Sequence, residues 1–361
     1  MKYRHAELLA AESISAAGTK TIDLDIVDCL SRIDIRWKAT KSKGSMDAHP
    51  AADILKIELV DGSDVLHSTT GYENQALAIY SRRVDTMNHG QHISGSSEES
   101  QYGIDFGRYL WDERLAFDPK RFKNPQLKIQ HNLALSDTGV SAAELEVFGH
   151  FFDEKVVSPM GFLMAKEHHD YTCGSDNSYE NIDLPTDYLI RQILVRAYRS
   201  GYEPWAQIDE ARLDEENLKR VVFDHDSLEN YYRVMKGVWK PVQELIVGIA
   251  SAGGVAFFVT PTDYWATMAL LSQGNSPDTY LSGSSMKGGA PTVISAAATQ
   301  FTGIVHGYLP NHCFQFPLGM QDDIDDWYDV TKLSRPRLRL RAAGSGTSGT
   351  GQVVLEQLRR Y

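Results

Sequence analysis

The chain has 361 residues, 42% of them hydrophobic and 23% charged, which is the composition of an ordinary globular protein long enough for two domains. Its 36 basic and 48 acidic residues give a formal net charge of −12, and this argues against direct binding to nucleic acid, because phosphate contacts need clustered Lys and Arg. The three cysteines lie far apart in the sequence, which argues against a disulfide framework and against a zinc site of the CxxC type.

The first half of the chain is predicted to be mostly strands. Residues 6–17 are rich in alanine and predict a short helix or arm that closes at Gly18. Residues 72–83 carry apolar side chains at helical spacing and predict a helix, whereas the polar Gly, Ser and His residues of 88–100 predict a loop. Alternating or β-branched runs predict strands over residues 22–39, 54–60, 104–110, 127–133 and 144–152.

The second half opens after Pro159 and repeats this pattern. We expect strands over residues 190–198, 218–223, 337–342 and 352–358, and a helix over residues 226–235. Residues 274–291 are rich in Gly, Ser and Pro and predict a long exposed loop. Many strands, few helices and long Gly/Ser loops indicate antiparallel sandwiches.

Short patterns recur in the same order in the two halves, which predicts a duplicated β-domain. The alternative, convergent strand patterning, remains open because each match is short. The boundary is expected near residues 155–160, which gives an N-terminal arm of residues 1–20, a first domain of 21–157 and a second of 158–361. The matching positions are Ile22 with Ile182, Ile33 with Ile193, Gly103 with Gly303, Phe117 with Tyr328, and Leu127 with Leu338.

The sequence shows no pattern typical of a secretion signal or of a membrane-crossing segment. The residues that follow Met1 lack the apolar run of a signal peptide, and the most apolar stretch, residues 247–259, is too short and too rich in glycine to cross a bilayer. We therefore expect a soluble, non-secreted protein in which Cys29, Cys173 and Cys313 stay reduced.

Three patterns resemble ligand sites. The run Gly344-x-Gly346-x-x-Gly349 fits a dinucleotide fingerprint, but the helix and second strand that the motif needs do not follow, so a mobile hairpin loop is preferred. His168 and His169 with Asp170 and Cys173 could hold a metal, yet adjacent side chains on a strand point to opposite faces, so a solvated surface is preferred. The acidic run from Asp322 to Asp326 lacks the Gly and Glu of an EF-hand; an exposed loop is preferred, and calcium binding stays open.

Catalysis has no recognisable motif in this sequence. It contains no GxSxG, HExxH, P-loop or kinase motif. The aromatic residues of the second half could stack on sugars or bases, but without interleaved basic residues core packing and subunit contacts are preferred. We therefore predict no catalytic, cofactor or metal site and no enzymatic activity. The aromatic residues considered are Tyr171, Tyr179, Trp205, Tyr231, Tyr232 and Trp239.

Three stretches resemble the double jelly-roll major capsid proteins of tailless icosahedral phages with an internal membrane, which share a lineage with the adenovirus hexon. The run from Asn181 to Arg196 is similar to the opening strands of the second barrel in those proteins. The pattern from Leu338 to Tyr361, two strands around a Gly/Ser/Thr segment, is similar to their last two strands. The stretch from Gly103 to Arg108 has the same character in the first half.

This resemblance implies an all-β fold of two tandem eight-stranded jelly-roll β-sandwiches with short helices in the loops. It implies a major capsid protein that forms homotrimers, which act as pseudo-hexagonal capsomers and tile an icosahedral shell. The implied partners are other copies of the chain, penton and minor capsid proteins and the surface of an internal membrane. The implied location is the virion, after assembly in the host cytoplasm. A shell separated from its genome by a membrane also fits the acidic charge and the absence of direct nucleic-acid contacts.

Two other functions remain open. The chain could be a minor virion or spike protein, which its copy number in purified particles would reveal. It could also be a glycan-binding protein or a glycan amidase on paired jelly rolls. That alternative predicts a secretion signal, or a cleft with convergent carboxylates and aromatic residues.

Overall fold

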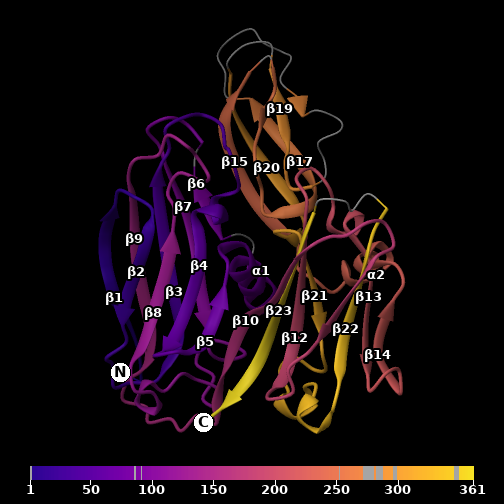
Figure 1. Ribbon diagram of the computed structural model, residues 1–361. Coiled ribbons are helices and arrows are strands. Elements are labelled where there is room, and N and C mark those ends of the chain that lie inside the picture. Colours follow the sequence, from indigo (N-terminus) through magenta and orange to yellow (C-terminus); the bar gives the residue numbers. More distant parts are fainter. Residues whose placement is uncertain are drawn as a thin grey trace.

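The computed structural model describes residues 2–84, 87–90, 92–251, 253–270, 280–281, 288–295, 299–344 and 349–361. Within them the chain forms two β-sandwiches side by side, with helix α1 (Gly71–Arg82) between them (Figure 1). A smaller group of strands rises above the second sandwich, and both marked chain ends lie at the opposite end of the molecule (Figure 1). The predicted all-β class is confirmed.

The first sandwich consists of two facing sheets. Ile33, Ile35 and Trp37 are buried between the sheets, because side chains alternate along a strand and every second residue points inward. One sheet has the order β1 (Tyr3–Ile14), β9 (Ala143–Phe152), β3 (Leu30–Thr40), β7 (Ser97–Asp105) and β6 (Asn88–Gly90). The other has the order β2 (Gly18–Asp23), β8 (Pro125–His131), β4 (Ile54–Asp61) and β5 (Asp64–Thr69).

The second sandwich repeats this connectivity. Helix α2 (Leu228–Met235) follows the fifth strand of its sandwich just as α1 does, so both predicted helices are confirmed and occupy equivalent places in the two sandwiches. Apart from the short β6, each sandwich has eight strands within the described residues, and the expected pair of jelly rolls is confirmed. The sheets are β10 (Gly161–Thr172), β23 (Thr350–Arg360), β12 (Leu189–Tyr198) and β21 (Cys313–Pro317), facing β11 (Tyr179–Asp183), β22 (Pro336–Ala342), β13 (Ile208–Glu215) and β14 (Arg220–His225).

The two sandwiches share irregularities as well as strand order. Strand β3 shifts register against β9 between Leu30 and Arg32, and β12 shifts against β23 between Ile190 and Gln192. A second matching shift occurs where β4 meets β5 and where β13 meets β14. Generic alternation does not produce bulges at corresponding positions, so these shifts favour duplication over convergent patterning.

Most of the predicted matching positions fall on equivalent strands. Ile33 and Ile193 lie in β3 and β12, and Leu127 and Leu338 lie in β8 and β22. The match of Gly103 with Gly303 is wrong. Gly103 lies in β7, whose counterpart is β21, and the register places Gln315 at the equivalent position. The pattern Gly-Ile-x-x-Gly is too short to distinguish that strand from an inserted one.

The inserted strands, which we call the tower, lie between α2 and β21. Phe257, Phe301 and Val305 form part of its small core. The loop expected over residues 274–291 lies mostly outside the described residues, which there comprise only 280–281 and 288–291. The tower strands are β15 (Val242–Ala250), β16 (Val255–Ala256), β17 (Pro261–Leu270), β18 (Tyr280–Leu281), β19 (Thr292–Ile294) and β20 (Thr299–Pro310).

Several local predictions are wrong. The helix or arm expected over residues 6–17 is strand β1, because pairing with β9 outweighs the weak helix preference of its alanines. The expected strand 22–39 is two strands, β2 and β3, in different sheets. The expected loop 88–100 contains β6 and the start of β7. The expected strand 104–110 is wrong over most of its length, because β7 ends at Asp105. Among the described residues, no helix is long and apolar enough to span a bilayer.

Candidate assembly site at the junction of the two sandwiches

The edge strands β5 and β10 join the two sandwiches, and we call this contact the seam. Ser68 of β5 pairs in parallel with Lys166 of β10, so that one sheet runs through both sandwiches. Close to it, Arg359 of β23 binds both carboxylate oxygens of Asp64, with N–O distances of 2.6 and 3.2 Å. Bidentate geometry of this kind fixes direction as well as distance.

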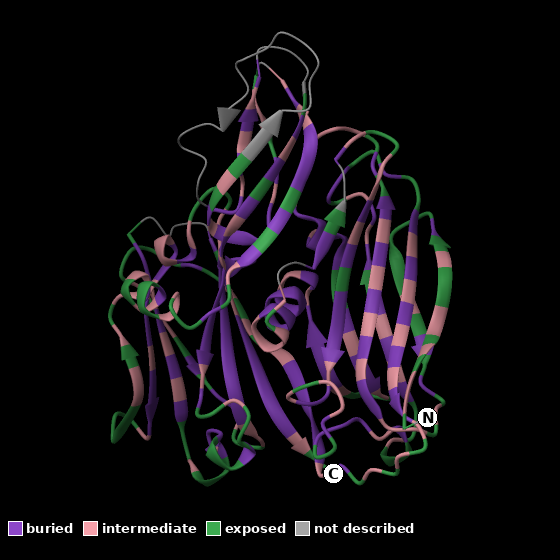
Figure 2. Ribbon diagram, turned by 180° about the vertical axis from the view of Figure 1, so that it is seen from behind, coloured by how far each residue is buried: buried purple, intermediate pink, exposed green. Residues whose placement is uncertain are grey.

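Helix α1 fills the space beside the seam, and Figure 2 shows its ribbon as largely buried. The helix begins at a capping box: the backbone N–H of Thr70 donates to Glu73 Oε2 at 2.8 Å, and the Thr70 hydroxyl accepts from the Glu73 N–H. Tyr80 donates its hydroxyl to the carbonyl oxygen of Cys313 in β21, at 2.7 Å. Residues of α1 and the second sandwich share one apolar cluster: Ala76, Leu77, Ala165, Leu194, Cys313 and Val354.

The opposite side of α1 is tied to the first sandwich. Arg82 binds Asp105 at 2.7 Å and Asp34 at 2.9 Å, and Asn74 donates to the carbonyl oxygen of Gly103 at 2.9 Å. Burial by itself would raise the pKa of the Asp105 carboxyl, but Arg82 and Arg32 outweigh it and hold that pKa below its usual range. Because α1 is tied to the first sandwich and packs on the second, it acts as a spacer between them.

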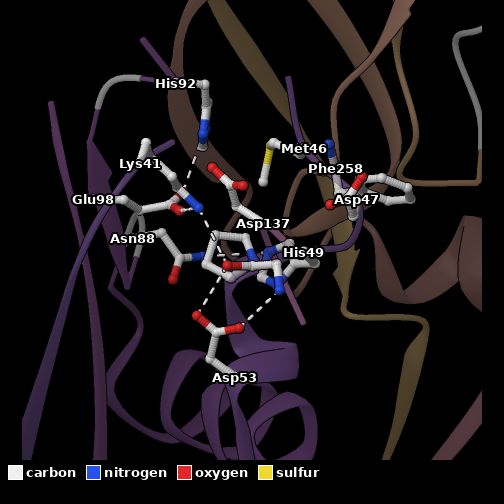
Figure 3. A network of polar contacts seen from close by, with 12 residues as sticks. Lys41, Met46, Asp47, His49, Asp53, Asn88, His92, Glu98, Asp137 and Phe258 are labelled. Carbon is white, nitrogen blue, oxygen red and sulfur yellow. Dashed lines mark hydrogen bonds and ion pairs between the residues drawn. The ribbon is translucent and has the colours of Figure 1, made fainter. Parts of the chain in front are cut away.

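A buried polar network supports the base of the tower (Figure 3). Lys41 forms an ion pair with Glu98, and His92 Nε2 lies 3.4 Å from the same carboxylate. The Lys41 ammonium also donates to the Ser136 hydroxyl at 3.2 Å, and Ser136 donates to Asp53 at 2.9 Å. The charged groups of this network are almost fully shielded from solvent.

Thr260 links this network to the tower. Asn88 donates to its hydroxyl at 2.9 Å, and His49 Nε2 lies 3.2 Å from the same oxygen. The backbone N–H of Thr260 donates to Glu244 Oε2 in β15 at 2.7 Å. Burial raises the pKa of Glu244 to about 7 and lowers that of His49 to about 3, so the imidazole is neutral at ordinary pH and the carboxyl is neutral below about pH 7. The arrangement suits holding two parts of the chain together, because most of its polar groups bond to one another.

Comparison with known proteins gives a result at the level of structure alone. No protein-family profile matches the chain, and no curated protein sequence matches it. Solved structures do match over nearly the full length. The major capsid protein of STIV has 10% identity and a TM-score of 0.60, covering 99% of this chain and 96% of that one. The major capsid protein of bacteriophage PM2 has 10% identity and a TM-score of 0.57, covering 99% and 98%. The fold is the double jelly roll.

A third match comes from PBCV-1, whose VP54 was fitted into a reconstruction of the virophage Sputnik. It has 8% identity and a TM-score of 0.59, and the alignment covers 99% of this chain and 93% of that one. At such identities the likeness establishes the fold, and the function of this double jelly roll needs its own argument.

The glycine-rich motif lies at a crossing between sheets. Gly344 follows β22 and Gly349 precedes β23, with residues 345–348 outside the described part of the chain. Strands β22 and β23 belong to opposite sheets of the double jelly roll, so the expected hairpin is wrong and the segment connects the two sheets. A strand follows the motif where a dinucleotide site would need a helix.

The two adjacent histidines of β10 each contact β11, a strand of the facing sheet. His168 Nε2 lies 3.0 Å from the carbonyl oxygen of Asp183, and His169 Nε2 lies 2.9 Å from Glu180 Oε1. Both rings reach residues of β11, at a place where β10 has a register shift, so the expectation that they point to opposite sides is wrong. Across the described residues, no three His, Cys, Asp or Glu side chains gather in a way that suits a metal ion.

The acidic run 322–326 forms a short turn at the surface. Asp323 accepts a hydrogen bond from the backbone of Asp325 at 3.1 Å, and Asp326 accepts one from Met320 at 2.7 Å. The backbone oxygen of Asp322 accepts from Arg108 at 2.6 Å, which links the turn to the first sandwich. These acidic side chains therefore serve as caps for local backbone groups.

The aromatic residues singled out in the sequence divide between core and surface. Tyr232 and Trp239 are buried, and Trp205 stacks on Tyr232 with ring centroids 5.0 Å apart. Tyr179 is exposed and lies under the guanidinium of Arg339. No pattern in the sequence predicted the seam or the buried network. The one available signal was charged residues such as Lys41 and Glu98 placed close to apolar strands, and it does not reveal partners.

Proposed function

We propose that the chain is a major capsid protein whose trimers act as pseudo-hexagonal capsomers of an icosahedral shell. The observation that carries this proposal is the side-by-side arrangement of two sandwiches with the same connectivity. Three such chains around a threefold axis present six similar barrels, and an assembly of that shape can occupy a sixfold position in a lattice. The likeness to capsid proteins over nearly the whole chain supports the same conclusion.

The two ends of the molecule suit the two sides of a shell. Many of the strands run roughly along the long axis, with both chain ends at one end and the tower at the other (Figure 1). In this proposal the tower faces outward and the opposite end faces the interior, toward an internal membrane. The division into two jelly rolls between residues 157 and 158 also belongs to the proposal, with β1 now counted in the first one.

The proposed partners are further copies of the chain, neighbouring capsomers, and penton and minor capsid proteins. The proposed location is the virion, after assembly in the host cytoplasm. The formal net charge of −12 supports a shell without direct nucleic-acid contacts. The proposed role is structural and non-enzymatic, with no cofactor. It is supported by the buried network at the tower base, where most polar groups bond to one another.

Analytical ultracentrifugation and electron microscopy of the purified full chain test this proposal. A trimer with a hexagonal outline at micromolar concentration is the expected result. A monomer at that concentration would contradict the proposal, since subunits of a shell bury large and permanent interfaces. In purified particles the chain should be the most abundant protein, and a few copies per particle would instead identify a minor or spike protein.

A further inference from the structure

Because the two sandwiches share their strand registers, each residue at the seam has an equivalent residue in the other sandwich, away from the seam. Ile33 corresponds to Ile193, and the strand pairings on either side extend this correspondence outward. The same procedure through β8 and β22 relates β5 to β14. The resulting equivalent pairs are Ala6 with Lys166, Phe148 with Val354, Asp153 with Arg359, Asp224 with Ser68, and Arg220 with Asp64.

The first sandwich contributes β5 and α1 to the seam, and the second sandwich carries the equivalent elements on its outer surface. Strand β14 and helix α2 are equivalent to β5 and α1, but β14 is the edge of its sheet within the described residues. Val221 in β14 and Val234 in α2 are 43% and 75% exposed. Between β14, α2 and β21 lies a groove of about 460 Å³, whose lining includes Phe223, Tyr231 and Phe316.

The second sandwich contributes β10 and β23 to the seam, and the first sandwich carries the equivalent strands, β1 and β9. Strand β1 is equivalent to β10 and is likewise an edge within the described residues. Next to it His5 stacks on Phe148 with centroids 5.2 Å apart, and His150 lies 4.7 Å from His5. The equivalent positions of the second sandwich, Ala165, Val354 and Glu356, lie on the face that α1 covers, where the first two pack against the helix.

The two surfaces carry complementary charges. Relative to the seam, the acidic and the basic residue have exchanged sides. Inside the chain the acidic residue Asp64 sits on β5 and its cationic partner Arg359 on β23. At the equivalent positions the cation, Arg220, sits on β14, and the acid, Asp153, follows β9. The Arg220 side chain is 66% exposed, which leaves it accessible to a second carboxylate beside Glu215.

We propose that β14 and α2 of one copy bind the β1–β9 face of the next copy in the way that β5 and α1 bind β10 and β23 within the chain. Arg220 then pairs with Asp153 of the partner subunit, and Asp224 lies beside Ala6 of the partner subunit. The contact joins unlike surfaces, and a ring closes after three copies because each chain supplies two of six barrels. This inference rests on the proposed function and adds the residues of its interface.

Charge reversal tests the ion pair in the full chain. Asp153→Arg and Arg220→Asp should each weaken the trimer by at least about tenfold in concentration, because each places like charges together. The double variant Asp153→Arg/Arg220→Asp should restore the trimer. Asp153→Arg loses the local partner Arg4, Arg220→Asp loses Glu215, and the double variant loses both, so recovery in the double reports the pair between subunits. Circular dichroism and a thermal melt confirm folding.

Cysteine cross-linking tests the predicted register without relying on charge. The variant Ala6→Cys/Asp224→Cys should give disulfide-linked trimers on oxidation, since paired strand positions fall within the roughly 4.4–6.8 Å Cα spacing that a disulfide needs. The control Ala6→Cys/Asp183→Cys uses β11, the opposite edge of the same sheet, and should remain uncross-linked.

The outcomes separate this inference from the proposed function. If the parent chain is a trimer but neither the charge swap nor the Ala6–Asp224 cross-link behaves as expected, the inferred interface is wrong and the capsid proposal stands. A parent chain that remains monomeric overturns both.

Discussion

Individual charges at the base of the tower are buried with their partners. Lys41 and Glu98 are almost completely shielded from solvent and form an ion pair. We expect Lys41→Met to lower the free energy of unfolding by about 3–5 kcal/mol, because it leaves a buried carboxylate without its cation. Urea unfolding of the full chain measures this difference.

The control for that variant is Lys43→Met. Lys43 pairs with Asp47 at 2.7 Å on the surface, where such a pair contributes less than about 1 kcal/mol. Equal losses of unfolding free energy in the two variants would show that the buried pair stabilises the fold no more than the surface pair.

Glu244 makes the stability of the tower base depend on pH. Burial raises its pKa to about 7, so the folded chain keeps a proton that the unfolded chain loses at a lower pH. The stability from this group is present below about pH 4.5 and is lost as the pH rises through 7. We expect Glu244→Gln, which mimics the neutral acid, to stabilise the protein by about 1–3 kcal/mol at pH 8 and to have little effect at pH 4.5. Urea midpoints at the two pH values test this, and a loss of stability at pH 8 would contradict it.

At the scale of elements, α1 carries the contact between the sandwiches. Leu77 is buried among side chains of β10, β12 and β23. We expect Leu77→Ala to cost about 2–4 kcal/mol, since the cavity lies where neither sandwich can close it alone. The matched control is Leu245→Ala in the tower, at a half-exposed leucine, with an expected loss below about 1 kcal/mol. Thermal or urea unfolding compares the two, and similar losses would argue against α1 as a spacer that stabilises the junction.

At the scale of the whole molecule, the two sandwiches are joined by more than the peptide that links them. Val156, between β9 and β10, is 95% exposed, so a protease site introduced there should be cut without disturbing either core. We expect the two fragments to remain together on size exclusion in native buffer, held by the seam, α1 and the tower base. Separate elution of the fragments would show that these contacts do not hold the halves without the link.

The sequence predicted the repeated parts of this molecule better than its junctions. Strands β3 and β12 alternate clearly, and helices α1 and α2 have apolar residues at helical spacing, so local pattern was sufficient there. The pattern failed at β1, where alanines such as Ala10 suit either state and pairing decides, and at β7, whose first residues are polar.

The junction could not be predicted because its partners are distant in sequence. Asn88 and Thr260 are joined only by the fold, and the same holds for Asp64 and Arg359. Composition and spacing give no register between such segments. The duplication was visible in outline, but its use as a guide to assembly needed the strand pairings themselves.

The central position of β23 has a consequence for synthesis. The first sandwich receives its closing strand, β9, by residue 152, and can fold while the rest of the chain is still being translated. The second sandwich lacks the middle strand between β10 and β12 until residues 350–360 have left the ribosome. During that interval β10 and β12 expose unpaired edges, which are templates for association with other nascent chains. Pausing or truncation before residue 350 should therefore send the protein toward aggregates, whereas a stop shortly after residue 152 should be far less harmful.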